Sequence, residues 1–283
     1  MRSGGALVIT SAALALGGCA LFVSLDGFSE GEEETTSAAD AGGDVVVAEA
    51  GDGGASAATG FCASLVPPPT FCNDFDHGRG EAFGWTKVET DLPAATALID
   101  TSDSVSAPGS MVFAVPPSTL AGGALRHHRR RDTGLTPSRE VRAAYKLRVE
   151  ATDKSRNIRA STLTFESSAG RDYFYVNVTD QAVRLQEQFY PAGAADADPS
   201  VTTLLSSSFA PGVWHQIEIR VTVQPPAIVV AIDGADAMAP RSLVAERLAG
   251  PVALSISTTS YSSQSTSIEA TRYRFDDFVL DVR

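Results

Sequence analysis

The sequence predicts an all-β fold in which two antiparallel sheets pack face to face as a β-sandwich or jelly roll. Short runs of alternating apolar and polar residues recur along the chain, the signal of half-buried strands. The clearest run has apolar residues at Ile217, Ile219, Val221 and Val223. Turn residues punctuate the runs, and only the segment 242–248 could form a helical turn.

In chain order, these signals predict strands over 71–76, 85–90, 95–100, 111–115, 123–129, 139–150, 158–167, 172–178, 182–189, 213–224, 227–233, 252–258 and 272–282. Pro225 and Pro226 cannot donate to a strand ladder, so they mark a turn between two of these strands. The dipeptide Asp233-Gly234 closes the second strand of this pair with another turn. The pair is therefore expected to form the antiparallel centre of a sheet.

Four consecutive runs, 139–150, 158–167, 172–178 and 182–189, show strong alternation. Stacked in one sheet, they would bury one face and present a second face rich in Arg, Gln, Tyr and Glu. The candidate ligand residues on this face, with one residue from the run 213–224, are Arg148, Tyr173, Tyr175, Arg184, Gln186, Gln188 and Arg220. Such a face is either a solvated surface or one on which sugars stack.

The formal net charge of −12 is concentrated near the N-terminus. Residues 20–58 hold nine acids and no Lys or Arg, whereas residues 59–283 hold 25 acids and 21 bases. Binding of nucleic acid requires a clustered basic face, and a nearly balanced domain gives no electrostatic support for one. We therefore expect no nucleic-acid partner.

Residues 1–18 have the composition of an export signal. Arg2 precedes an apolar run, 6–16, that is too short to cross a bilayer and suits a signal-peptide core. The run ends in Leu16-Gly17-Gly18-Cys19, which resembles the bacterial lipobox; the alternative is an ordinary signal followed by a chance cysteine. The resemblance implies lipidation of Cys19 and a membrane anchor. Because Ala20 follows, the Gram-negative sorting pattern implies the outer membrane.

Residues 19–60 are expected to form a disordered acidic linker, because Gly, Ala, Ser, Asp and Glu dominate and cannot bury enough apolar surface to fold. A flexible spacer of this length reaches roughly 30 to 35 Å on average. Residues 61–283 then form one β-domain, since about 225 residues suffice for one all-β core and are few for two.

Cys62 and Cys72 remain once Cys19 is assigned to the lipid. In an oxidising compartment two remaining cysteines are expected to form a disulfide. A loop of this size would contribute roughly 3 kcal/mol to stability in the chain-entropy model. The alternative, a metal-binding or catalytic cysteine, lacks a His or third Cys at ligand spacing.

The main basic cluster is the run Arg126-His127-His128-Arg129-Arg130-Arg131. It could contact acidic polysaccharide, lipid headgroups or the linker's carboxylates. Alternation along a solvent-exposed strand and turn explains it without any ligand. His127 and His128 lack a third ligand at suitable spacing, so no metal is expected there.

The order of elements resembles the concanavalin A-like lectin/glucanase fold in its laminin-G-like branch. The resemblance covers residues 70–283 and rests on four stretches: Phe71-Cys72-Asn73-Asp74-Phe75-Asp76, the strand Gly212-x-Trp214-His215-x-Ile217-x-Ile219, the next strand, which ends in Asp233-Gly234, and the closing 273–282. It implies that the last strand pairs near the first. In this superfamily these two strands often share a structural calcium ion.

The carboxylates available for calcium are Asp74, Asp76, Asp276 and Asp277. Calcium takes six to eight oxygen ligands, which clustered Asp side chains and nearby carbonyls can supply. The alternative is that these acids protect strand edges and face water. No other cofactor is expected.

The resemblance also bears on catalysis. Family-16-like glucanases carry a Glu-x-Asp-x-x-Glu run on one strand, whereas Glu218 is followed here by Ile219-Arg220-Val221, so hydrolysis is not expected. Alginate-lyase-like relatives use Arg, Gln, His and Tyr across one sheet face. The candidate face and His215 supply these residue types without the motifs of those enzymes.

The sequence therefore predicts an envelope-anchored lipoprotein whose β-domain binds polysaccharide or a surface protein without catalysis. Two alternatives stay open: a structural or interaction protein without sugar specificity, and a divergent polysaccharide lyase.

Overall fold

The computed structural model describes residues 60–78, 80–90, 95–120, 123–125, 127–153, 157–179, 182–262 and 266–283. The predicted export signal, the lipidation site Cys19, most of the acidic linker and Arg126 lie outside these residues. Among the described helices, none is long and apolar enough to cross a membrane.

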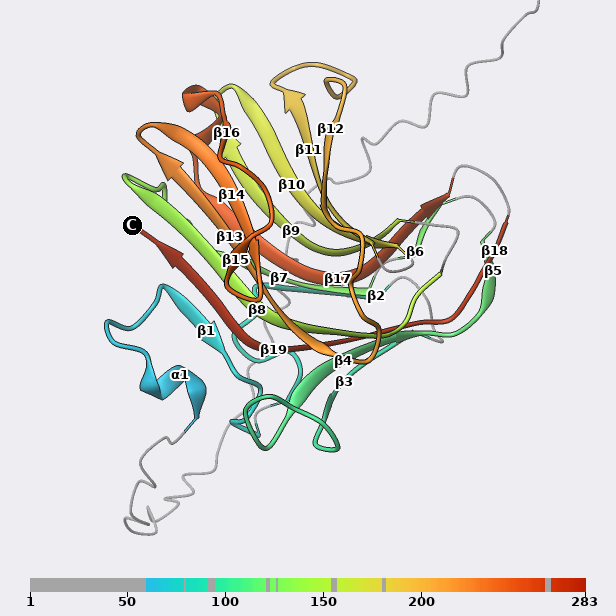
Figure 1. Ribbon diagram of the computed structural model, residues 1–283. Helices are drawn as coiled ribbons and strands as arrows, with labels where there is room; N and C mark the ends of the chain where they lie inside the picture. Colours follow the sequence, from blue (N-terminus) through green and yellow to red (C-terminus); the bar gives the residue numbers. More distant parts are fainter. Residues whose placement is uncertain are drawn as a thin grey trace, which may run out of the picture. The chain divides into compact units, whose positions relative to one another are not determined.

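Antiparallel strands make up most of the described chain and form two large sheets (Figure 1). The nine-stranded sheet contains β1 (Phe71–Asn73), β3 (Thr96–Asp100), β4 (Ser110–Val115), β8 (Glu140–Ala151), β13 (Trp214–Val223), β14 (Pro226–Ile232), β15 (Ala235–Asp236), β16 (Arg241–Ser242) and β19 (Thr271–Val282). Its order is β15-β14-β13-β8-β19-β4-β3, with β1 paired to β19 and β16 to β14.

The eight-stranded sheet contains β2 (Lys87–Thr90), β6 (Gly123–Leu125), β7 (His127–Asp132), β9 (Ile158–Ser167), β10 (Gly170–Thr179), β11 (Ala182–Pro191), β12 (Val201–Ser206) and β17 (Val252–Ser262). Its order is β12-β11-β10-β9-β17-β7-β2, with β6 paired to β17. A small third sheet pairs β5 (Ser118–Leu120) with β18 (Thr266–Ile268). The helices are short: α1 (Phe61–Ser64) and the 3-10 turn η1 (Ala245–Leu248).

The predicted two-sheet antiparallel architecture is confirmed. The hairpin of β13 and β14 forms as expected, and Ile232 pairs with Ala235 across a two-residue turn. Asp233 and Gly234 in this turn have φ angles of 53° and 81°. A two-residue hairpin turn of this type needs positive φ at both positions, which Asp tolerates and Gly adopts freely.

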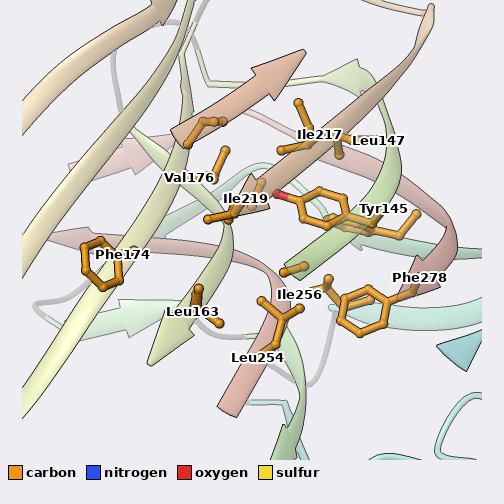
Figure 2. Close-up of a cluster of buried hydrophobic side chains, with 14 of the residues drawn as sticks. Tyr145, Leu147, Leu163, Phe174, Val176, Ile217, Ile219, Leu254, Ile256 and Phe278 are labelled. Carbon is orange, nitrogen blue, oxygen red and sulfur yellow. The ribbon is translucent and has the colours of Figure 1, made fainter. Parts of the chain in front are cut away.

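The core lies between the two large sheets (Figure 2). The nine-stranded sheet contributes Tyr145, Leu147, Ile217, Ile219 and Phe278, and the eight-stranded sheet contributes Leu163, Phe174, Val176, Leu254 and Ile256. Burial of each large apolar side chain contributes about 1.5 to 3 kcal/mol. The hydroxyls of Tyr145 and Ser161 lie 2.6 Å apart in a hydrogen bond across the sandwich, so neither buried polar group lacks a partner.

One part of the predicted sheet arrangement is wrong. The strands corresponding to 139–150, 158–167, 172–178 and 182–189 do not share one sheet, because β8 pairs with β13 and β19 in the nine-stranded sheet. The other three, β9, β10 and β11, are neighbours in the eight-stranded sheet. Alternation within a strand reports which residues share a face but carries no information about the pairing partner.

The predicted disulfide is confirmed between Cys62 of α1 and Cys72 of β1, with their Cα atoms 5.7 Å apart. β1 in turn pairs with β19, so that Phe71 faces Leu280 in the ladder. The last strand therefore lies beside the first, as expected.

Candidate functional site

The candidate site is the outer face of the eight-stranded sheet, turned away from the core. Because Phe174, Val176 and Leu185 point into the core, the residues that alternate with them point outward. We call the following outward residues of β7, β17, β9, β10 and β11 the polar face: His128, Arg130, Ser255, Ser257, Arg159, Thr162, Thr164, Tyr173, Tyr175, Asn177, Arg184, Gln186 and Gln188.

The strand ladders align these side chains in rows across the sheet. One row runs Arg130, Ser255, Thr162, Tyr175, Gln186, and the next runs Thr164, Tyr173, Gln188. On the other side of the first row, Asn177 lies between Arg159 and Arg184, and His128 lies opposite Ser257. Five of the predicted ligand residues, those at 173, 175, 184, 186 and 188, are thus brought together.

Two tyrosines occupy the middle of the polar face. The rings of Tyr173 and Tyr175 are stacked with their centroids 5.6 Å apart, and the edge of Tyr190 packs against Tyr173 at 5.5 Å. The Arg159 guanidinium lies 3.4 Å from the centre of the Tyr175 ring. Tyr175 is therefore only 5% exposed, and Tyr173 and Tyr190 are the rings of this group that remain accessible to a sugar.

Asn177, which is 5% exposed, supports the polar face through a hydrogen bond that the predicted residues did not include. Its Nδ2 donates to Gln186 Oε1 at 3.0 Å, which fixes the orientation of both side-chain amides. Asn177 was not among the predicted ligand residues, although it follows Tyr173 and Tyr175 at period two, and this spacing could have indicated it. The partly exposed amides of Gln186 and Gln188 offer donors and acceptors to sugar hydroxyls and donors to sugar carboxylates.

Positive charge gathers toward the β10–β11 side of this face. Arg184 donates to Asn157 Oδ1 and Thr179 Oγ1, both neutral, and contacts no carboxylate among the described residues. Arg171, at the end of β10, is exposed. On the β7 side the charges are paired, since Arg130 contacts Asp132 and Glu166. The polar face therefore favours an anionic ligand near β10 and β11.

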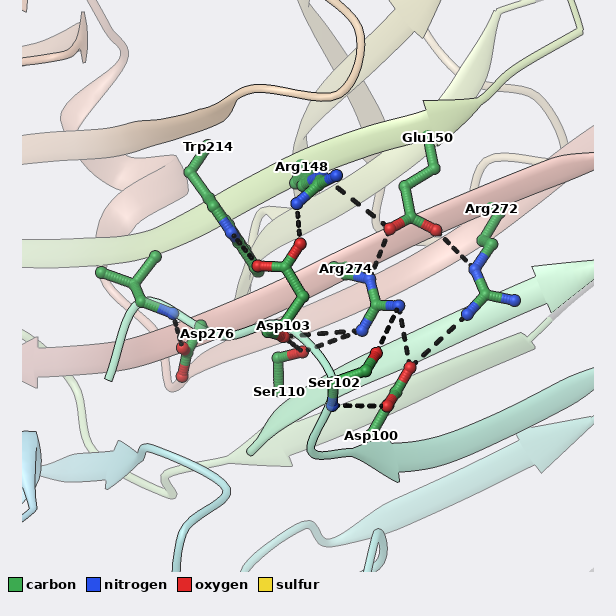
Figure 3. Close-up of polar contacts among 11 residues, drawn as sticks. Asp100, Ser102, Asp103, Ser110, Arg148, Glu150, Trp214, Arg272, Arg274 and Asp276 are labelled. Carbon is green, nitrogen blue, oxygen red and sulfur yellow. Dashed lines mark hydrogen bonds and ion pairs between the residues drawn. The ribbon is translucent and has the colours of Figure 1, made fainter. Parts of the chain in front are cut away.

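Arg148 and Arg220 do not belong to the polar face, contrary to the sequence-based expectation. Both lie on the nine-stranded sheet because their strands, β8 and β13, pair there. Arg148 contacts Asp103 and, at 3.8 Å, Glu150 (Figure 3). Arg220 pairs with Glu218 at 3.2 Å and Asp236 at 2.8 Å.

The basic run on β7 is also divided between two faces. Arg129 is 2% exposed and its guanidinium lies 5.8 Å from the centre of the Phe113 ring, while that of Arg131 lies 5.0 Å from the Phe71 ring. Both therefore point toward the core side, and the expectation of one exposed basic strand is wrong for them. His128 and Arg130 stay on the polar face, where His128 lies 3.4 Å from Glu89.

The four carboxylates predicted to bind calcium lie where the first and last strands meet. Asp74 and Asp76 follow β1, and Asp276 and Asp277 lie at an irregularity in the pairing of β19 with β8. Burial, followed by the neighbouring Asp277 carboxylate, raises the pKa of Asp276 to about 7. Burial is also the largest cause of the raised pKa of Asp76 and of Asp277.

These residues fit a calcium ion only in part. One buried oxygen of Asp76 and one of Asp277 have no hydrogen-bond partner, which suits a hard cation. Asp276 instead accepts hydrogen bonds from the backbone N–H groups of Val105, Ser106 and Asp277. Within the described ranges, no group of three or more His, Cys, Asp or Glu side chains is arranged to hold a metal ion.

We propose that any calcium site centres on Asp76 and Asp277 and is completed by carbonyl oxygens or water. Calcium at a hundredfold excess over its dissociation constant should then raise the melting temperature by about 5 to 10 °C. Asp277→Asn should abolish the shift, and magnesium should not reproduce it. An unchanged melting temperature in calcium would exclude the site.

Comparison with known proteins shows the fold. The sequence matches no protein-family model. No curated protein matches it either. Among solved structures it resembles an endo-β-1,4-glucuronan lyase from the fungus Trichoderma reesei, with a TM-score of 0.60 at 12% identity over 76% of this chain and 96% of that one.

Two further structures share the architecture. A GlcNAcα1-4Gal-releasing endo-β-galactosidase from Clostridium perfringens superposes with a TM-score of 0.53 at 9% identity, over 74% of this chain and 61% of that one. A cellulose-induced protein gives a TM-score of 0.50 at 12% identity, over 74% of this chain and 96% of that one. At these identities the likeness establishes a jelly-roll β-sandwich of the concanavalin-like kind.

Proposed function

We propose that the polar face binds polysaccharide, with a preference for acidic chains. The observation that carries this proposal is the alignment of tyrosine, amide and arginine side chains in rows across β7, β17, β9, β10 and β11. Five strands at about 4.8 Å spacing make a surface about 19 Å wide, which exceeds one sugar and suits a chain. The names of the glucuronan lyase and the endo-β-galactosidase, which share the fold, also support a glycan ligand.

The preference for acidic chains follows from the charges. Arg184 has only neutral partners among the described residues, so its charge is available to a ligand carboxylate. Arg184 pairs with Asn177 on the neighbouring strand, and Tyr173 lies four residues, or two outward-facing positions, from Asn177 and offers a partly exposed ring. A uronate-containing chain could pack a sugar face on that ring while its carboxylate meets the guanidinium.

Affinity measurements with glucuronan, alginate and pectate, against dextran as the neutral polymer, test this proposal. We expect at least one acidic polymer to bind, and Tyr173→Ala and Arg184→Gln each to weaken binding about tenfold, in line with about 1.4 kcal/mol for one lost contact. Arg220→Gln, on the opposite sheet, is the matched control and should change nothing. Failure of all polymers to bind would favour the alternative of an interaction protein without sugar specificity.

A second candidate function is a polysaccharide lyase acting by β-elimination. The observation that favours it is the closeness of Tyr175, Arg159 and the Asn177–Gln186 amide pair. The amides and the guanidinium would stabilise a uronate carboxylate while a base removes the proton from the adjacent carbon. The bond to the leaving sugar oxygen would then break, a carbon–carbon double bond would form, and an acid would protonate the oxygen.

Following the absorbance of unsaturated product during incubation with the same polymers tests this second function. A lyase should release unsaturated product from at least one uronate polymer. If no polymer yields product while binding is retained, the lyase function is rejected and the polar face binds polysaccharide without catalysis.

We further propose that the protein is exported and anchored to the outer membrane through lipid on Cys19. The apolar run before Cys19 and the acidic spacer after it support this placement. The mature protein should then begin at Cys19 and carry acyl chains detectable in its intact mass. An unmodified N-terminus at another residue would refute the anchor.

A further inference from the structure

A pocket of about 310 Å³ lies on the opposite side of the domain from the polar face. Its floor is the outer face of β8 and β13, and its other walls come from α1, the loop at Val105 and the bulged part of β19. The lining residues are Phe61, Leu65, Val105, Arg142, Ala144, Tyr145, Lys146, Gln216, Asp277 and Val279. This volume is at the lower end of the range for sites that bind small molecules.

Two cations lie on the pocket floor. Lys146 Nζ donates to Gln216 Oε1 at 3.1 Å, a neutral partner, and forms no ion pair among the described residues. Arg142 uses Nε and Nη2 on Glu218 Oε2, at 3.0 and 2.8 Å, and its Nη1 has no partner in the described part of the chain. Lys146 also attracts the carboxylates of Asp277, which lines the pocket, and of Asp233. The floor therefore presents unused N–H donors from two cations whose charge is only partly balanced, and such donors favour a small anion.

The roof and most of the walls are apolar, and Asp277 is the charged residue on the wall. Phe61 and Leu65 approach from the α1 segment, and Val105 and Val279 complete this side. The Cys62–Cys72 disulfide ties α1 to β1, and Cys62 N–H also donates to Asp74 Oδ2 at 3.0 Å. The roof is thus fixed in place over the charged floor, and the pocket combines an apolar contact surface with donors on one side.

We propose that this pocket binds a compact organic carboxylate, with the carboxylate on Lys146 and Arg142 and an apolar or C–H-rich face against Phe61 and Leu65. A divalent or bulky anion suits the pocket less, because Asp277 places one carboxylate on its wall. Two sources share this chemistry: a sugar acid and an apolar ring acid. The site is separate from the polar face and does not depend on its function.

Calorimetric titration of the purified full chain with D-glucuronate and with cyclohexanecarboxylate tests the proposal and distinguishes the two sources. At least one carboxylate should bind, and its neutral counterpart, D-glucose or cyclohexylmethanol, should bind at least tenfold more weakly. Phe61→Ala should weaken binding of the ring acid more than that of the sugar acid, since only the apolar contact is lost.

Lys146→Gln should weaken binding of the carboxylate at least tenfold while leaving the melting temperature within a few degrees of the parent. Lys87→Gln, on the eight-stranded sheet and outside the polar face, is the matched control. It should bind the carboxylate as the parent does. Absence of binding by both carboxylates, or unchanged binding by Lys146→Gln, would overturn the proposal.

Discussion

Replacing Arg274 with methionine is expected to lower the free energy of unfolding by about 3 kcal/mol, because it leaves two carboxylates without their main cation. Arg274 is 5% exposed. Its Nε lies 2.5 Å from Glu150 Oε1 and its Nη2 lies 2.8 Å from Asp100 Oδ2 (Figure 3). Urea-induced unfolding of the parent and the variant measures the difference.

Arg272 provides the matched control for this prediction. It contacts the same two carboxylates, with Nε 2.5 Å from Glu150 Oε2 and Nη2 3.6 Å from Asp100 Oδ2, but its side chain is 42% exposed. Exposed ion pairs contribute about 0 to 1 kcal/mol, so Arg272→Met should have a small effect. Equal losses of unfolding free energy in the two variants would contradict the prediction, because they would show that burial does not decide how much each arginine contributes.

The network explains how one loop is held on the nine-stranded sheet. Asp103, in the loop after β3, accepts a hydrogen bond from Trp214 Nε1 at 3.0 Å and pairs with Arg148. Figure 3 shows these contacts continuous with those of Arg274. Arg148, expected from the sequence to contact a ligand, instead has this structural role.

Asp172→Asn is expected to stabilise the protein by about 1 to 3 kcal/mol above pH 7 and to have little effect below about pH 4. Asp172 is 1% exposed on the core side of β10, and neither carboxylate oxygen has a hydrogen-bond partner among the described residues. Burial, followed by the nearby Glu187 carboxylate, raises the pKa of Asp172 to about 7.

The direction of this stability difference follows from how the folded and unfolded states bind the proton of Asp172. A carboxyl whose pKa is raised on folding holds its proton in the folded state up to about pH 7, whereas the unfolded chain releases it near pH 4. Its contribution to stability is therefore complete below about pH 4 and is lost as the pH rises through 7. Asparagine stays neutral at every pH and avoids this loss.

Melting temperatures of the parent and Asp172→Asn at pH 5.5 and pH 8.5 test this expectation. Asp198→Asn is the control, because Asp198 contacts Arg247 from an exposed position, with 48% of its side chain accessible. The difference between Asp172→Asn and the parent should grow with pH, and that for Asp198→Asn should not. If the variant is less stable than the parent at pH 8.5, the prediction is wrong. The ionised Asp172 would then stabilise the fold through its attraction to Arg241 and Arg247.

Local signals in the sequence predicted most of the strands. Alternation located β8 to β11 and the β13–β14 hairpin to within a few residues, because side-chain period depends only on the strand itself. The disulfide followed from counting cysteines. β12 was not predicted, since it lies at the edge of its sheet and exposes Val201 and Leu204, so its pattern does not alternate.

The candidate site could be predicted only in part, because pairing between distant strands decides which side chains meet. The residues at 173, 175, 184, 186 and 188 lie on neighbouring strands that are only two residues apart in the sequence, so their grouping could be predicted. Arg159 reaches Tyr175 through the β9–β10 ladder, and His128 joins the face through β17, which is far away in the sequence. Nothing local to these residues indicates such contacts.

The claim that the polar face carries the ligand is tested most directly by hydrogen–deuterium exchange with and without a bound acidic polysaccharide. Binding should slow exchange in β9, β10 and β11 and in the loops joining them, and leave β13 and β14 unchanged. Protection confined to β13 and β14, or no protection in the eight-stranded sheet under saturating polymer, would contradict the account.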